Sequence, residues 1–268
     1  MIIFKSINKL NKEVNFKVDI GFVPTMGALH QGHVSLIKKS KNKCNKTLVS
    51  IFVNPTQFNE KKDYKNYPKN IKKDIKLLNS LKVDYVLIPT VKDVYKNKNK
   101  NKFKISNSKK VLCAKYRPGH FEGVLSVINQ YMKKIKVKKL FLGEKDYQQY
   151  LIIKEFLKKK KSRVNVILCR TKRMRNGLAY SSRNKLLSYN SIKKSALIVS
   201  KIKRMFNLLK KDLKNKVIIK KFINNNKNLK IEYLELRNKN NLSKYITKKN
   251  VKIFFSFYIQ GIRLIDNY

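Results

Sequence analysis

The sequence contains no tryptophan and has few glycines, prolines, histidines and cysteines for its 268 residues. Cys44, Cys113 and Cys169 lie far apart, so neither a disulfide framework nor a structural zinc site is predicted. No apolar run approaches the ~18–20 residues that would span a bilayer, and residues 1–5 do not resemble the start of an export signal. These absences predict a cytoplasmic protein that does not enter a membrane.

Acidic residues are also scarce, because 15 Asp and Glu face 65 Lys and Arg and leave a formal net charge of +50. Such a charge permits nucleic-acid binding through the release of counterions. Most of the cations are lysines scattered along the chain, however, whereas specific recognition favours the guanidinium fork of arginine. We interpret most of the charge as a solvated surface, produced by A/T-rich codons, that binds nucleic acid only non-specifically.

Short apolar runs rich in β-branched residues alternate with helical patterns over the first two thirds of the chain. This alternation is typical of a parallel sheet with crossover helices. The expected strands are 20–23, 47–53, 83–88, 139–142 and 164–168, and the expected helices are 32–41, 71–81, 121–135 and 147–158. The lysine- and asparagine-rich run 96–107 predicts a surface loop without a role in the chemistry.

The pattern changes after residue 171. A long helical stretch at 186–213 precedes extended segments at 230–236, 251–259 and 263–265, which follow one another without intervening helices. The sequence therefore predicts an α/β protein, with a Rossmann-like parallel sheet and flanking helices in residues 1–175 and a smaller C-terminal α+β domain in residues 176–268.

The segment 23–33, Val-Pro-Thr-Met-Gly-Ala-Leu-His-Gln-Gly-His, carries the strongest chemical signal. It follows the first expected strand and opens a helix, whose N-terminal N–H groups can receive an anion. Gly27 and Gly32 let the backbone approach a ligand, and His30 and His33 point to one side of the first turn. Two histidines that only cap a helix would give the same pattern. Neither a P-loop nor a dinucleotide fingerprint is present.

This segment resembles the H-x-G-H signature of the nucleotidyltransferase superfamily, and its Pro-Thr-Met-Gly lead-in is similar to that of the pantothenate synthetase family. Five further segments resemble the same family in the same order, namely 53–58, 67–68, 117–121, 143–149 and 181–184. The C-terminal part resembles it more weakly, through 233–235 and 263–267. The resemblance implies a homodimer that joins pantoate to β-alanine with ATP, through a pantoyl adenylate, and releases AMP and diphosphate. It also implies a C-terminal lid over ATP.

The residues of these segments suit that chemistry, because negative charge on the phosphates must be balanced as diphosphate leaves. The catalytic groups that the resemblance implies are His30, His33, Lys145 and Arg183. The implied nucleotide-binding set is Met26, Gly27, Ala28, Leu29, His30, Gln31, Gly32, His33, Gly143, Glu144, Lys145, Asp146, Lys172, Tyr180, Ser181, Ser182 and Arg183. We expect no protein metal site and expect Mg²⁺ to arrive with ATP, because the sequence shows no cluster of carboxylates.

The resemblance also implies a substrate-binding set, which is Gln57, Gln149, Asn54, Tyr67, Arg117 and His120. Arg117 and His120 either form the pocket for the second substrate or anchor a loop. Outside its motif, Lys145 would be one more surface lysine. Asp146 suits a ribose hydroxyl, and a helix N-cap equally well.

The chain departs from the family pattern at a few positions. Asn176 and Tyr180 stand where Asp and Met are usual, and Lys69 and Ala114 replace Arg and Gly. Two rival functions stay open: another H-x-G-H nucleotidyltransferase, which the two glutamine segments disfavour, and a basic nucleic-acid-binding module that kept the fold and lost catalysis.

Overall fold

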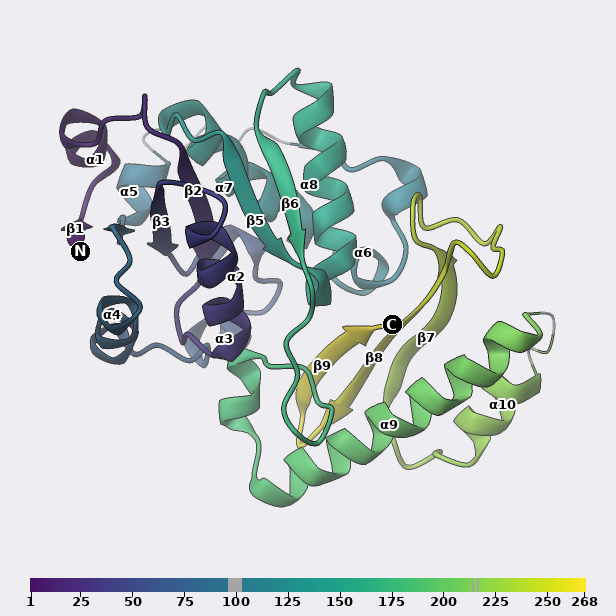
Figure 1. Cartoon of the computed structure of the whole chain (residues 1–268). Helices are drawn as coiled ribbons and strands as arrows, with labels where there is room; N and C mark the ends of the chain where they lie inside the picture. Colours follow the sequence, from purple (N-terminus) through teal and green to yellow (C-terminus); the bar gives the residue numbers. More distant parts are fainter. Residues whose placement is uncertain (96–102, 214, 216) are drawn as a thin grey trace.

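Six parallel strands form the larger of two sheets, in the order β1-β4-β3-β2-β5-β6 (Figure 1). The computed structural model describes residues 1–95, 103–213, 215 and 217–268. The six strands are β1 (Ile2–Phe4), β2 (Ile20–Thr25), β3 (Lys46–Ile51), β4 (Tyr85–Leu87), β5 (Lys139–Gly143) and β6 (Asn165–Cys169). Because all the pairings are parallel, the carboxyl ends of the strands meet at one edge of the sheet.

Helices cover both faces of this sheet. They are α1 (Ile7–Glu13), α2 (Gln31–Lys41), α3 (Lys61–Lys65), α4 (Ile71–Ser80), α5 (Val91–Val94), α6 (Cys113–Tyr116), α7 (His120–Lys134) and α8 (Tyr147–Lys159). On one face, Val49 packs with Ile37 of α2 and Leu78 of α4. On the other, Phe22 packs with α7 and α8 in a larger core. Phe22 and Val23 are both fully buried, as successive residues of a strand covered on both sides must be.

The C-terminal third builds a separate three-stranded antiparallel sheet in the order β7-β8-β9. Its elements are α9 (Tyr189–Lys211), α10 (Val217–Asn224), β7 (Ile231–Asn238), β8 (Val251–Ile259) and β9 (Ile262–Asn267). Ile202 of α9 packs with Phe255 and Phe257 of β8 in a second core. In Figure 1 this sheet lies beside the carboxyl edge of the parallel sheet.

Polar contacts connect the C-terminal sheet to the parallel-sheet part of the chain. Arg173, in the connection after β6, donates to both carboxylate oxygens of Asp266 on β9, at 2.5 and 3.0 Å. The neighbouring Asn267 side chain donates to the carbonyls of Glu144 and Lys145, at 2.9 and 3.0 Å. The turn after β5 is therefore supported from the C-terminal sheet. The boundary between residues 175 and 176 stays a prediction.

The α/β class, the five predicted strands and the five predicted helices are confirmed, with shifts of a few residues at their ends. The long helix starts at Tyr189 because the Ser188 side chain caps it by accepting the N–H of Ser191. The preceding residues form the short 3-10 helix η4 (Ser182–Leu186). Other 3-10 helices are η1 (Pro55–Gln57), η2 (Asn107–Lys109) and η3 (Glu144–Asp146). The part of the expected loop at 96–102 lies outside the described residues. No helix in the described part of the chain is long and apolar enough to cross a membrane.

Candidate active site

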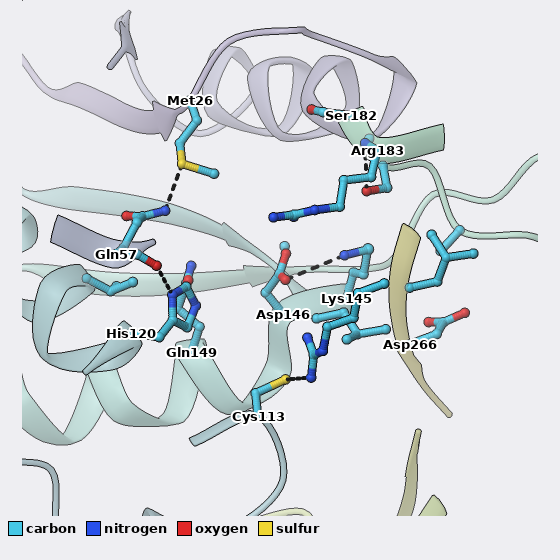
Figure 2. A pocket seen from close by; sticks show the side chains of 18 of the residues that line it. Met26, Gln57, Cys113, His120, Lys145, Asp146, Gln149, Ser182, Arg183 and Asp266 are labelled. Carbon is cyan, nitrogen blue, oxygen red and sulfur yellow. Dashed lines mark hydrogen bonds and ion pairs between the residues drawn. The ribbon is translucent and has the colours of Figure 1, made fainter. Parts of the chain in front are cut away.

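A cavity of about 600 Å³ opens at the carboxyl edge of the parallel sheet. Its walls come from the turns after β2, β3 and β5, the start of α7, η4 and the C-terminal sheet, and Figure 2 shows side chains from several of them. The expected site residues that line it are Met26, His30, Gly32, His33, Asn54, Gln57, Tyr67, Arg117, His120, Gly143, Lys145, Asp146, Gln149, Lys172, Tyr180, Ser181, Ser182 and Arg183. Segments that are far apart in the sequence thus meet in one place.

Five expected residues do not line the cavity: Gly27, Ala28, Leu29, Gln31 and Glu144. Gln31 is exposed at the start of α2. The Glu144 carboxylate pairs with Lys252 Nζ on β8 at 3.0 Å. This glutamate therefore joins η3 to the C-terminal sheet and does not present its carboxylate to the cavity.

The turn after β2 adopts an unusual backbone conformation. Gly27 and Ala28 both lie in the left-handed region, with φ of 77° and 50°. The two oxygens of the Asp74 carboxylate accept the N–H groups of Ala28 and Leu29, at 2.8 Å each. Sequence reasoning missed Asp74, although it occupies a position on the buried side of α4, four residues before Leu78, where an apolar residue is usual.

His30 and His33 stand together at the start of α2, with ring centroids 4.0 Å apart. His30 Nδ1 accepts the N–H of Gly32 at 3.1 Å and so caps the helix, which places the imidazole proton on Nε2. Burial, aided by His33 and Lys145, lowers the pKa of His30 to about 2. Burial also lowers the pKa of His33 to about 4, although Asp146 opposes this shift. Both imidazoles are therefore neutral at pH 7 and can donate hydrogen bonds without carrying charge.

Two flexible cations face the cavity, each beside a carboxylate. Lys145 Nζ lies 3.5 Å from Asp146 Oδ1. Arg183 Nη2 lies 2.9 and 3.0 Å from the two oxygens of Asp63 on α3. The Arg183 guanidinium also stands over the Tyr67 ring, 5.7 Å from its centroid. Sequence reasoning missed Asp63, because nothing in the run of charges around it indicates a partner 120 residues away.

Gln57 is buried and has its amide oriented by neighbours. Asn54 Nδ2 donates to Gln57 Oε1 at 3.2 Å, and Gln57 Nε2 contacts Met26 Sδ at 2.7 Å (Figure 2). The side-chain oxygen Asn54 Oδ1 in turn accepts hydrogen bonds from the hydroxyls of Thr56 and Tyr95, both at 2.9 Å. The Asn54 amide is thus occupied by protein groups, and it sets the direction in which Gln57 points.

Arg117 and His120 both form hydrogen bonds with the backbone carbonyl of Gln57. His120 Nδ1 donates to the Gln57 carbonyl at 2.6 Å, and Arg117 Nη1 donates to His120 Nε2 at 3.1 Å. Burial, with a further contribution from Arg117, lowers the pKa of His120 to about 3. The pair therefore anchors η1, and it lines the cavity as well, so both roles that the sequence left open fit the geometry. Gln149 also lines the cavity, with no hydrogen-bond partner among the described residues.

The 172–184 segment closes the cavity beside the histidines. The Tyr180 N–H donates to the Lys172 carbonyl at 3.1 Å, and the Tyr180 ring stacks on His30 with centroids 6.3 Å apart. Asn176 Oδ1 accepts the N–H of Leu178 at 3.2 Å, so this residue keeps the turn without the negative charge of Asp. Ser182 Oγ donates to the Ala28 carbonyl at 3.2 Å and joins η4 to the histidine turn.

The charge of the cavity suits a polyanion. Its lining includes the cationic side chains of Arg117, Lys145, Lys172, Arg183 and Arg263. Within residues 1–95, 103–213, 215 and 217–268, no three His, Cys, Asp or Glu side chains stand close enough to hold a metal ion. An anionic ligand of this cavity therefore meets lysine, arginine and neutral imidazole groups.

Comparisons with known proteins agree on one family. The family model described as "Pantoate-beta-alanine ligase" matches residues 2–268. The chain is 42% identical over 272 residues to "Pantothenate synthetase" of Francisella tularensis subsp. mediasiatica (strain FSC147), covering 98% of this chain and 94% of the relative. It is also 42% identical over 279 residues to "Pantothenate synthetase" of Francisella tularensis subsp. novicida (strain U112), covering 100% and 97%.

Solved structures give the same result. The crystal structure of pantothenate synthetase from Thermus thermophilus superposes with a TM-score of 0.92 at 27% identity, covering 100% of this chain and 99% of that one. The crystal structure of pantoate-beta-alanine ligase from Francisella tularensis, complexed with beta-gamma ATP and beta-alanine, superposes with a TM-score of 0.83 at 37% identity, covering 100% and 97%. The likeness therefore extends over both sheets.

Proposed function

The chain belongs to the pantoate-beta-alanine ligase family, and from this premise we propose which of its residues carry out the reaction in the cavity at the carboxyl edge of the parallel sheet. It is an enzyme that uses ATP to join pantoate to β-alanine. One observation carries the assignment. The two neutral histidines, Lys145 and the oriented amide of Gln57 all line the same cavity.

In the first step, the pantoate carboxylate oxygen attacks the α-phosphorus of ATP. A P–O bond to pantoate forms, and the P–O bond to diphosphate breaks. Lys145 and Arg183 balance the charge that moves onto the departing phosphates, and the N–H groups of His30 and His33 donate to phosphate oxygens. Because both imidazoles are neutral, they orient the phosphates through directed hydrogen bonds. Lys145 and Arg183 supply the positive charge.

Pantoate is held on the other side of the reacting phosphorus. Asn54 orients the Gln57 amide. The Gln57 and Gln149 amides together bind the hydroxyl and carboxylate oxygens of pantoate. In the second step, the β-alanine amine attacks the acyl carbon of the pantoyl adenylate. A C–N bond forms, the C–O bond to AMP breaks, and the amine loses a proton. Arg117 lies in the cavity wall and suits the β-alanine carboxylate.

The nucleotide lies between the histidine turn and the 172–184 segment. Gly143 leaves room for the sugar, Asp146 accepts from ribose hydroxyls, and the backbone near Lys172 and Tyr180 faces the adenine. Mg²⁺ would arrive with ATP and would supply further balance of phosphate charge.

The remaining parts of the proposal concern the whole protein. Residues 1–175 bind nucleotide and pantoate, and residues 176–268 cover them as a lid. The enzyme is a homodimer in the cytoplasm, and its net charge of +50 gives only non-specific binding to nucleic acid.

The test measures diphosphate release from ATP and Mg²⁺ with pantoate, with and without β-alanine. Lys145→Ala and His33→Ala are expected to lower the rate about a hundred-fold or more, because each removes a donor to the phosphates. Lys158→Ala, which removes an exposed lysine on α8, is the matched control and should leave the rate unchanged.

Pantoate-dependent release that β-alanine converts into pantothenate supports the assignment and its two steps. If Lys145→Ala and His33→Ala both release diphosphate at the wild-type rate, these two residues have no role in the reaction. A folded wild-type protein that releases no diphosphate, yet binds RNA in a salt-dependent manner, would favour the inactive nucleic-acid-binding alternative.

A further inference from the structure

The buried carboxylate of Asp74 contacts the histidine turn from outside the cavity. Asp74 lies in the first turn of α4, has 3% of its surface exposed, and does not line the cavity. Its two oxygens accept the N–H groups of Ala28 and Leu29, both at 2.8 Å. These are the last two residues before His30, so only one peptide unit separates this contact from the first histidine.

The backbone of the turn needs such a partner. With Gly27 and Ala28 both in the left-handed region, successive N–H groups point to the same side and form a concavity that suits an anion. Ala28 adopts a conformation that residues with a Cβ atom rarely adopt, so the surroundings must fix it. A Cβ atom on Gly27 would lie 2.9 Å from Asp74 Oδ2, and the glycine therefore lets the carboxylate approach.

The opposite side of the turn is also fixed. Ser182 Oγ of η4 donates to the Ala28 carbonyl, while Asp74 accepts the Ala28 N–H. Upstream, Thr25 Oγ1 accepts the N–H of Gly27 at 3.2 Å. The turn is thus held from β2, α4 and η4, and the contact from α4 is the one that carries a charge.

We propose that Asp74 is a positioning residue for the ligase reaction: its carboxylate fixes the left-handed turn that aims His30 and His33 into the cavity. It acts without touching substrate, because the backbone N–H groups it binds belong to the turn. The proposal rests on the proposed function, since the effect of replacing Asp74 is measured as a change in kcat of that reaction. Its effect on the histidines can be measured separately.

The variant Asp74→Asn tests this role, because it replaces one of the two accepting oxygens with an NH2 group, which donates and cannot accept the second N–H. The matched control is Asp93→Asn on α5, whose carboxylate accepts the N–H and hydroxyl of Thr90 in a capping box outside the cavity. Asp74→Asn is expected to lower kcat by about ten- to a hundred-fold, which is the effect of misplacing reacting groups by about 1 Å. Asp93→Asn should leave kcat unchanged.

A spectroscopic signature separates positioning from simple loss of stability. The sequence contains three histidines, so the side-chain nitrogen NMR spectrum should hold three imidazole pairs. In Asp74→Asn we expect the His30 and His33 signals to shift, because the bond from the Gly32 N–H to His30 Nδ1 is disturbed. The His120 signals, from α7, should keep their positions and serve as the internal reference.

Asp74→Glu is the second variant, for use if Asp74→Asn does not fold. It keeps the charge but moves the carboxylate by one methylene, so it should shift the same two histidines and lower kcat. Unchanged histidine signals with wild-type kcat in a folded variant would overturn the proposal and leave Asp74 a stabiliser of α4 alone. If the wild-type protein releases no diphosphate, the proposed function fails, and the NMR shifts still decide whether Asp74 positions the turn.

Discussion

The ionisation of the buried histidines depends on their surroundings more than on the imidazole itself. Burial lowers the pKa values of His30, His33 and His120 to about 2, 4 and 3. An unfolded chain exposes the same side chains at a pKa near 6.5. The folded protein therefore binds fewer protons than the unfolded chain between pH 6.5 and the lowered pKa values, and this difference links stability to pH.

We predict that the protein loses stability as the pH falls from 7 to 5. Stability rises with pH wherever the unfolded state binds more protons, so the contribution of these histidines is complete above pH 6.5 and decreases below it. Each histidine can change the free energy of unfolding by up to about 1.4 kcal/mol per pH unit in this window. Urea unfolding at pH 7, 6 and 5 measures the slope.

The variant His120→Asn provides the control, because its amide can still donate to the Gln57 carbonyl but does not titrate. Its unfolding free energy should depend less steeply on pH than that of the wild type. An unfolding midpoint that stays constant from pH 7 to pH 5 would show that these imidazoles do not resist protonation in the folded protein.

Site residues were predictable where they occur in short motifs, and much less so where they act from elsewhere in the chain. Gln57 and Lys145 belong to motifs and line the cavity as expected. Asp74 reaches the histidine turn across 46 residues, and Asp63 reaches Arg183 across 120. The sequence around Asp63 gives no sign of its contact, and the position of Asp74 on the buried side of α4 does not indicate which turn it reaches. Asn54 lines the cavity, and neighbouring protein groups also occupy its side-chain amide, so its contact with substrate stays a prediction.

The packing of α7 against η1 decides where Gln57 lies. At Gly123 of α7, an added Cβ atom would stand 2.1 Å from the Thr56 carbonyl oxygen and 2.8 Å from the Gln57 nitrogen. Both are backbone atoms, so they can move only if η1 moves. A glycine is therefore required at this crossing, although alanine is the better helix former.

We predict that Gly123→Ala raises the KM for pantoate about ten-fold or more, because η1 must shift and carry Gln57 with it. The KM for ATP should change much less. The control is Gln130→Ala on the same helix, which leaves the crossing intact. A Gly123→Ala variant that is more stable than the wild type and keeps its KM for pantoate would contradict this account of the crossing.

Helix α3 supplies the carboxylate that contacts Arg183. The pair between Asp63 and Arg183 is partly buried, with 35% and 25% of the two side chains exposed. In the proposed mechanism, phosphate oxygens of ATP bind the same guanidinium. The nucleotide would then displace or share this contact.

We predict that Asp63→Asn lowers the Kd of a non-hydrolysable ATP analogue about two- to five-fold, the amount expected from a partly exposed ion pair. Calorimetric titration at low salt measures it. Glu13→Gln, which removes an exposed partner of Lys9 on α1, should leave the Kd unchanged. A weaker affinity in Asp63→Asn would mean that Asp63 positions Arg183 and does not compete for it.

The central strands were predictable because each combines β-branched residues with burial on both faces. Strand β1 was not, because it has three residues and the side chains of Ile2 and Ile3 are exposed at the sheet edge. Helix α10 was also missed, because it has only eight residues and none of its described residues is fully buried. Sequence patterns thus reveal elements that bury a full face and miss those that rest on the surface.

The charge of the whole molecule opposes its compact state. The 15 carboxylates can neutralise only a small part of the 65 cations, so most lysines repel one another. This repulsion is long-ranged at low salt and is screened when the Debye length falls from about 30 Å at 10 mM to about 8 Å at 150 mM.

We predict that added sodium chloride raises the Tm over that range. The double variant Lys158→Glu and Lys201→Glu replaces two exposed lysines and should have a higher Tm than the wild type at low salt, with a smaller difference at high salt. A Tm that stays constant or falls with salt would indicate that the lysines are arranged so that their repulsion is negligible.

The place of β2 in the sheet affects how the chain folds while it is being synthesised. This strand pairs with β3 soon after it in the sequence, but its other neighbour is β5, which starts more than a hundred residues later. While the ribosome still holds those residues, the nascent chain carries β2 with one backbone edge unpaired. Such an edge can pair with another chain. The nascent chain is therefore exposed to aggregation at this edge of β2 until β5 has been made.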